Sequence, residues 1–237
     1  QLIEQIAYRR GFGDILAEGV ARASRKIGKD SHRYAHHSKG LEMTGFDPRG
    51  LKATGLGYAV STRGGDFTSV YALPETKWAP DKCEKAFGSR SAADRFAHEG
   101  KAEVVRLSAI VSAVIDALGI CKVPALSLIC EFDLKREAQL VSILTGRQVD
   151  GEALFKIGER IFNLENLFNI RNSPWLPRAG IPEMFSKKPL SDGPSLGRTV
   201  DLESMVQNFY RSMGWDADGK PKCSTLKNLK IADFACS

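Results

Sequence analysis

The sequence predicts a mainly α-helical fold built from many helices, and two observations support this. Apolar residues recur at helical intervals in several long segments, whereas scarcely any stretch shows the apolar–polar alternation of a half-buried strand. We find no internal repeat and no low-complexity tract. The segments with helical spacing are residues 13–27, 48–61, 104–118, 151–169 and 202–213.

The first predicted helix covers residues 13–27. Its apolar side chains recur at helical intervals, and Asp14 lies in the first turn, where negative charge is favoured. Residues 36–63 are rich in glycine and proline. We predict that the first part of this segment is irregular and that a helix follows over about residues 48–61. We predict that residues 71–100 form an irregular capping loop.

The second half contains two amphipathic helices. Residues 151–169 present a broad apolar face, and residues 202–213 form the last helix. Between them, residues 173–198 contain five prolines, which predict an extended strap.

The segment 104–118 is apolar on nearly every side, which predicts a helix buried all round. Asp116 and Cys121 lie at its end, and Gly119 can end the helix in the left-handed conformation. Because a buried ionised carboxylate costs several kcal/mol unless donors surround it, we expect a polar ligand at this end. The alternative for the hexapeptide alone is a structural Asp beside a cysteine that only fills the core.

Composition limits the class of protein. The chain has 237 residues, of which 43% are hydrophobic, so it can bury a core in one large domain or two modest ones. No apolar run approaches the roughly 20 residues that cross a bilayer, and the N-terminus is no signal peptide. The net charge of +6 is spread among acidic residues, so we expect no nucleic-acid partner. The missing initiator Met suggests a fragment, a processed chain or an incompletely traced one.

The five cysteines are irregularly spaced and include no C-x-x-C pair. Their odd number argues against a fully paired disulfide framework, so we expect a reducing, cytoplasmic location. A single cysteine can still be one ligand of a metal cluster whose other ligands come from elsewhere.

Several ordered motifs resemble the C-terminal part of the tungsten-containing aldehyde ferredoxin oxidoreductases. The resemblance covers nearly the whole chain, and its motifs occur in matching order and separation. They are Lys39-Gly-Leu-Glu-Met43, Asp47-Pro-Arg-Gly50, Gly55-Leu-Gly-Tyr-Ala59, Arg63-Gly-Gly65, Asp116-Ala-Leu-Gly-Ile-Cys121, Ile157-Gly-Glu-Arg-Ile161 and Tyr210-Arg-Ser-Met-Gly-Trp-Asp216.

The resemblance implies two helical domains, about residues 1–121 and 122–237, which close over a tungsten or molybdenum bis-pyranopterin. It also implies what this chain lacks: the N-terminal domain that forms the base under the pterins, and the C-x-x-C-x-x-x-C run that supplies most ligands of a four-iron four-sulfur (4Fe-4S) cluster. We therefore expect a missing N-terminal half or subunit as a partner, and an oligomer.

Four residues match cofactor-binding positions of the resembled family. Cys121 matches the fourth cluster ligand and would be the only metal ligand from this chain. Asp116 matches the residue that accepts hydrogen bonds from a pterin, Ile120 the position whose backbone touches it, and Arg63 an arginine of the pterin site. Without the resemblance, Arg63 would be interpreted as a helix C-terminal charge before a Gly-Gly stop.

One position departs from the resembled family. Phe67 stands where aldehyde oxidisers have a histidine thought to move protons, and phenylalanine cannot transfer a proton. Asp66 is the nearest ionisable candidate, although an Asp beside a Gly-Gly turn is more often a turn or cap residue. Ser69 replaces a lysine that often contacts the pterin. The catalytic acid or base is therefore left open.

Three functions follow as alternatives. The first couples aldehyde or carboxylate redox chemistry to ferredoxin or to a partner iron–sulfur subunit. The second is the catalytic subunit of a tungsten-dependent benzoyl-CoA reductase, in which Phe67, Tyr71 and Trp78 would stack on the ring of an aroyl-CoA. The third is a non-catalytic remnant or interaction subunit, in which Asp116 and Cys121 are structural.

Overall fold

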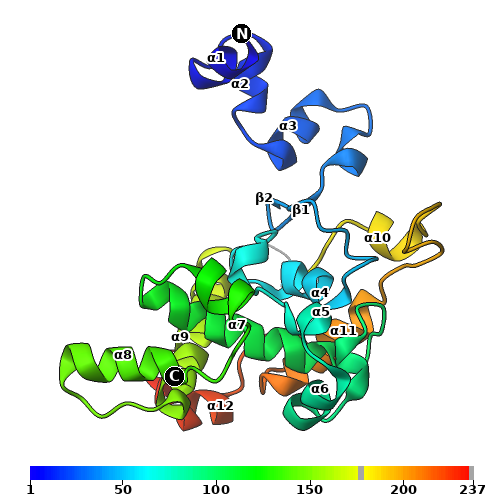
Figure 1. Cartoon of the computed structure of the whole chain (residues 1–237). Coiled ribbons are helices and arrows are strands. Elements are labelled where there is room, and N and C mark those ends of the chain that lie inside the picture. The colour runs from blue at the N-terminus through cyan, green and yellow to red at the C-terminus, as the bar shows by residue number, and fades with distance from the viewer. Residues whose placement is uncertain (176–178, 235–237) are drawn as a thin grey trace.

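The computed structural model describes residues 1–175 and 179–234 and confirms the mainly α-helical prediction (Figure 1). Helix α7 (Lys101–Ala117) is the central element and packs against α4 (Lys52–Val60), α9 (Gly151–Asn172) and α11 (Leu202–Ser212). In the described part of the chain, the sheet is a single two-stranded antiparallel hairpin, β1 (His37–Ser38) and β2 (Leu41–Glu42). No described helix is long and apolar enough to cross a membrane.

The core forms where these helices cross. Gly158 lets α9 lie directly against α7, because a Cβ at this position would come within 2.5 Å of the Ile110 carbonyl oxygen. The largest cluster of buried apolar side chains joins residues of α4, α7, α9 and α11. It therefore includes residues on both sides of position 121, and the division into domains 1–121 and 122–237 stays a prediction.

Several predicted elements were wrong in extent. The helix predicted over residues 13–27 is two helices, α2 (Phe12–Leu16) and α3 (Val20–Ile27), because Gly19 between them has a positive φ of 80°. The predicted loop 71–100 contains α5 (Pro74–Lys77), α6 (Pro80–Phe87) and a 3-10 turn. Both helices begin at proline, which is favourable at the first helical position because its missing N–H would be unpaired there.

The remaining helices lie outside the predicted segments or within the strap. They are α1 (Leu2–Ala7), α8 (Lys135–Thr145), α12 (Cys223–Asn228) and, within the predicted strap, α10 (Met184–Lys187). Part of that strap, residues 176–178, lies outside the described residues.

A buried ion pair connects the starts of α4 and α7. The Glu75 carboxylate accepts hydrogen bonds from the backbone N–H groups of Ala53 (2.8 Å) and Thr54 (3.0 Å) in the first turn of α4. Its partner is the Lys101 ammonium, at 3.6 Å, in the first turn of α7. The two side chains are 1% and 0% exposed. Burial raises the pKa of Glu75 and lowers that of Lys101. The pair thus fixes where both helices begin.

Lys52 is a second buried cation, and its burial should make the free energy of unfolding depend on pH. Its ammonium donates to the carbonyls of Arg49 and Thr199, and burial lowers its pKa from 10.5 to about 8. The charged form is thus penalised in the folded state below about pH 8, and the penalty disappears as pH rises toward 10.5. From about pH 7 to about pH 10, the free energy of unfolding should rise by about 2.5 kcal/mol relative to Lys52→Met. Urea unfolding of both chains at the two pH values measures this, and parallel profiles would contradict it.

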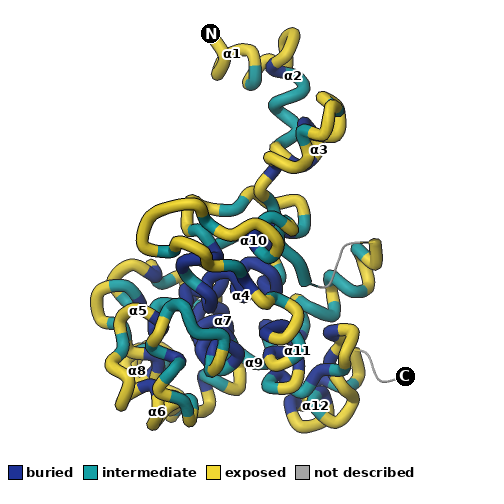
Figure 2. Tube along the Cα trace, turned by 90° about the vertical axis from the view of Figure 1, so that its right-hand side faces the viewer, coloured by how far each residue is buried: buried dark blue, intermediate teal, exposed yellow. Residues whose placement is uncertain are grey.

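The N-terminal helices form an arm that stands away from the helical body (Figure 1). Helix α3 packs on β2, and the backbone N–H of Val20 donates to the Glu42 carboxylate at 2.7 Å. Along the tube of Figure 2, the arm is mostly exposed or half-buried, whereas the helices of the body are buried where they meet. Large apolar side chains on the arm face solvent, namely Leu2, Ile3, Tyr8, Phe12 and Tyr34.

Candidate functional site

The candidate site begins at the C-terminus of α7. Gly119 has a φ of 68°, and the Ile120 N–H donates to the Ile115 carbonyl at 3.1 Å, which is the hydrogen bond of a Schellman helix end. This confirms the helix end predicted from Gly119. The burial predicted for Asp116 is wrong: its side chain is 47% exposed, and Cys121 is a free, exposed cysteine. The reason is that α7 leaves the body in its last turn, so the core side chains end at Ile115.

Two cations meet at one oxygen of Asp116. Its Oδ2 lies 2.7 Å from the Lys122 ammonium and 3.2 Å from the Arg63 guanidinium. Arg63 also pairs with Asp66 at 3.1 Å. These four residues form a charge network of two cations and two carboxylates. No residue in the described part of the chain donates to the other oxygen of Asp116, Oδ1, so that oxygen can accept hydrogen bonds from a bound group.

The Gly-Gly turn after Arg63 is shaped by the β hairpin beneath it. Gly64 has a φ of 99°, and a Cβ there would lie 2.3 Å from the Ser38 carbonyl oxygen. A Cβ on Gly65 would lie 2.6 Å from the Leu41 carbonyl oxygen. Only glycine allows this close approach. The β hairpin and the Gly64-Gly65 turn thus together support the position of Arg63, although both lie far from Asp116 in the sequence.

Asp66 is held as a capping residue. Its Oδ1 accepts hydrogen bonds from the backbone N–H and the hydroxyl of Thr68, at 2.8 and 2.7 Å, and its Oδ2 pairs with Arg63. Each carboxylate oxygen therefore already has a partner, which favours the turn interpretation over a catalytic one. The Ser69 hydroxyl, in turn, contacts the Ser61 hydroxyl at 2.5 Å.

Phe67 belongs to an aromatic group beside the charge network. Its ring lies 4.7 Å from that of Phe46 and 4.8 Å from that of Tyr71, measured between centroids. Phe46 is partly exposed, so the group reaches the surface. Trp78, which we expected with these rings, makes its ring contacts with Phe87 and Phe132 instead.

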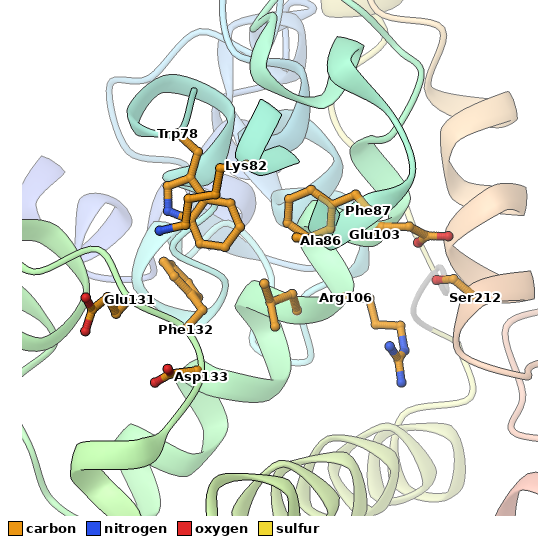
Figure 3. A pocket seen from close by; sticks show the side chains of 11 residues that line it. Trp78, Lys82, Ala86, Phe87, Glu103, Arg106, Glu131, Phe132, Asp133 and Ser212 are labelled. Carbon is orange, nitrogen blue, oxygen red and sulfur yellow. The ribbon is translucent and has the colours of Figure 1, made fainter. Parts of the chain in front are cut away.

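Trp78 lines a separate cavity of about 600 Å³ (Figure 3). Its ring stacks on Phe87 at 5.5 Å and meets the edge of Phe132, and the Lys82 ammonium lies 4.1 Å from its centre. Glu103 and Arg106, from the first half of α7, line the same cavity. At 1.5 Å per residue, Asp116 is about 15 Å further along the helix from Arg106. None of the four predicted cofactor-binding residues lines this cavity.

The structure thus brings Arg63 and Asp116 into contact, and Ile120 and Cys121 follow Asp116 just beyond the end of α7. It adds Lys122, whose Nζ also donates to the Thr68 carbonyl at 2.6 Å. Burial lowers the pKa of Lys122, and the hydrogen bond to Asp116 raises it in part. No three His, Cys, Asp or Glu side chains of the described residues gather to hold a metal ion, so any cluster at Cys121 would need ligands from outside the described residues.

Comparisons with known proteins agree with the architecture. A family model described as aldehyde ferredoxin oxidoreductase, domains 2 and 3, matches residues 1–231. The tungsten-containing aldehyde ferredoxin oxidoreductase of Pyrococcus furiosus is 35% identical over 236 residues, which are 98% of this chain and 36% of the relative. The WOR-like subunit of an aliphatic sulfonate oxidoreductase from the same organism is 30% identical, and 34% of it is covered. The chain therefore spans about a third of the length of these relatives.

A solved structure shares the fold. The active-site complex BamBC of benzoyl coenzyme A reductase, bound to 1,5-dienoyl-CoA, superposes with a TM-score of 0.68 at 19% identity. The match covers 99% of this chain and 39% of that one.

Proposed function

Because the chain belongs to the aldehyde ferredoxin oxidoreductase family, we propose that it is the cofactor-closing helical part of a bis-pyranopterin iron–sulfur oxidoreductase. The metal would be tungsten or molybdenum, and the reaction would couple aldehyde or carboxylate redox chemistry to ferredoxin. The single observation that carries the proposal is the end of α7, where a free exposed thiol follows a carboxylate with one oxygen available.

The residues present fit such a cofactor. Cys121 would supply one thiolate to a 4Fe-4S cluster, with the other ligands from the missing N-terminal half or subunit. Asp116 Oδ1 would accept hydrogen bonds from the donor edge of a pterin, Arg63 would donate to its acceptors, and the Ile120 backbone would contact it. When bound, the cofactor supplies two-electron chemistry at the substrate carbon, and the cluster supplies electron transfer to ferredoxin or a partner subunit.

The chain's own residues restrict how a proton could move. Phe67 cannot transfer one, and both oxygens of Asp66 are engaged by Thr68 and Arg63. Asp66 is the nearest carboxylate to that position in the sequence and stays a candidate. We infer that Asp66 would serve as acid or base only if it gave up its hydrogen bonds from Thr68 or its ion pair with Arg63.

An aroyl-CoA substrate is the second candidate, and the aromatic group of Phe46, Phe67 and Tyr71 favours it. Apolar rings next to the charge network would accept the flat face of an aromatic ring better than a histidine would. The chain would then be part of the catalytic subunit of a dearomatising benzoyl-CoA reductase. Turnover of aldehydes against aroyl-CoA thioesters by the native assembly separates the two candidates.

The exposed arm supports the expected partner. Residues 1–34 present several large apolar side chains to solvent, and the relatives are almost three times as long as this chain. A surface of this kind typically becomes buried against another domain or subunit. We propose that the missing N-terminal half covers the arm and the end of α7 together, in an assembly that is oligomeric.

Metal analysis of the anaerobically purified native assembly tests the proposal. Mass spectrometry should find tungsten or molybdenum with iron, and the EPR spectrum should show a reducible cluster. If the intact assembly contains neither a pterin metal nor a cluster, the third alternative stands, in which the chain is a non-catalytic remnant or an interaction subunit.

A further inference from the structure

Lys122 is an unusual lysine for a surface site, because its side chain is only 8% exposed. It follows the free Cys121 directly and comes just before a π-helical turn, Val123–Leu128. Its ammonium donates to Asp116 Oδ2 at 2.7 Å and to the Thr68 carbonyl at 2.6 Å. One buried cation thus joins the end of α7 to the turn that carries Phe67.

Arg63, the other cation at Asp116, binds this carboxylate more weakly. Arg63 is 48% exposed, is further from Oδ2 at 3.2 Å, and shares its guanidinium with Asp66. Exposed ion pairs of this kind contribute little because water and salt screen them, whereas a buried ammonium with two acceptors fixes both of them in place. Without Lys122, the Asp116 carboxylate would be free to rotate toward Arg63 and water.

We propose that Lys122 is a positioning residue for the cofactor: it holds Asp116 by Oδ2, so that Oδ1 stays available to the pterin, and holds the residue 66–69 turn at a fixed place beside it. This inference rests on the proposed function. Partners that orient metal ligands typically change metal affinity by about 10- to 100-fold when removed. Because Asp116 would contact the pterin and not the metal, we expect an effect near the lower end of that range.

The test compares variants of the native assembly, purified anaerobically, by tungsten and molybdenum content per chain, cluster EPR signal and thermal midpoint. Lys122→Met should lower the content of the pterin metal about 10-fold or more, while Lys122→Arg should restore most of it, because guanidinium can donate to both acceptors. Lys156→Met is the matched control, since Lys156 is an exposed lysine paired with Glu152 at 3.3 Å. This control should retain the wild-type metal content.

A double-substitution cycle shows whether Lys122 acts through Asp116. If it does, Asp116→Asn lowers the metal content, and adding Lys122→Met to it causes little further loss. Independent losses that multiply would overturn the proposal, as would a Lys122→Met assembly with wild-type metal content. If Lys122→Met does not accumulate, Lys122→Gln, which keeps a donor for the Thr68 carbonyl and removes the charge, replaces it in the same cycle.

The outcomes separate this inference from the proposed function. A wild-type assembly with pterin metal and cluster, together with an unaffected Lys122→Met assembly, refutes the role of Lys122 and leaves the proposed function standing. A wild-type assembly without either metal centre refutes the proposed function, and the inference with it.

Discussion

Replacing Cys121 by alanine should remove the proposed 4Fe-4S cluster from the native assembly and leave the fold intact. The side chain is exposed and lies after the end of α7, outside the buried apolar clusters, so its loss should cost little folding free energy. A 4Fe-4S cluster is typically held by four Cys thiolates, so losing one of them should weaken its binding strongly. We expect the iron content to fall by about four atoms per chain and the cluster EPR signal to disappear.

Cys130→Ala is the matched control for this experiment. Cys130 is also a free cysteine, half-buried and nine residues further along the chain, and it belongs to the core cluster around Trp78. Its replacement should keep the iron content and the EPR signal. If the Cys121→Ala assembly retains a full cluster, Cys121 is no ligand and the interpretation of the end of α7 must be abandoned.

Replacing Glu75 by alanine should destabilise the helical body by about 3–5 kcal/mol, the cost typical of breaking a buried ion pair. Among the described residues, the substitution leaves the buried Lys101 ammonium with only the Ala92 carbonyl as an acceptor, at 2.8 Å. It also leaves the N–H groups of Ala53 and Thr54 without their partner at the start of α4. Urea unfolding of the 237-residue chain near neutral pH measures the change in the free energy of unfolding.

Glu152→Ala provides the comparison, because Glu152 makes an exposed i,i+4 pair with Lys156 at 3.3 Å. Its loss should cost less than about 0.5 kcal/mol. Glu75→Gln, which keeps an acceptor for α4 and removes the charge, should have an intermediate effect. A Glu75→Ala chain as stable as Glu152→Ala would mean that the buried pair is dispensable.

Helical periodicity predicted the long elements of the body well. The segments 151–169 and 202–213 correspond closely to α9 and α11, because apolar side chains recur on the face of each helix that packs against α7. Periodicity failed where the backbone conformation of one residue ends a helix. Gly19 separates α2 from α3 by its positive φ, and the spacing of apolar residues carries no information about φ. The hairpin of β1 and β2 was missed because two residues per strand give no alternation to detect.

The sequence motifs single out the residues of the candidate site, whose binding of a cofactor stays a prediction, and they do not give the surroundings of these residues. Arg63, Asp116, Ile120 and Cys121 follow from sequence motifs, and the structure places Arg63 against Asp116 across 53 positions of the chain. The exposure of Asp116 was not predictable, since the apolar residues before it do not say where a helix leaves the core. Nor was the burial of Lys122 predictable, because a lysine after a cysteine gives the same sequence pattern whether its side chain is solvated or buried.

The charge network at the end of α7 has a consequence for assembly. Its two cations and two carboxylates cancel formally, so this surface is electrically balanced before any cofactor arrives. A balanced surface attracts few counterions from solution, and few need to be displaced when a neutral hydrogen-bonding edge approaches. Insertion of such a group would then depend on removing water from Asp116 and Arg63, and its rate should change little with ionic strength.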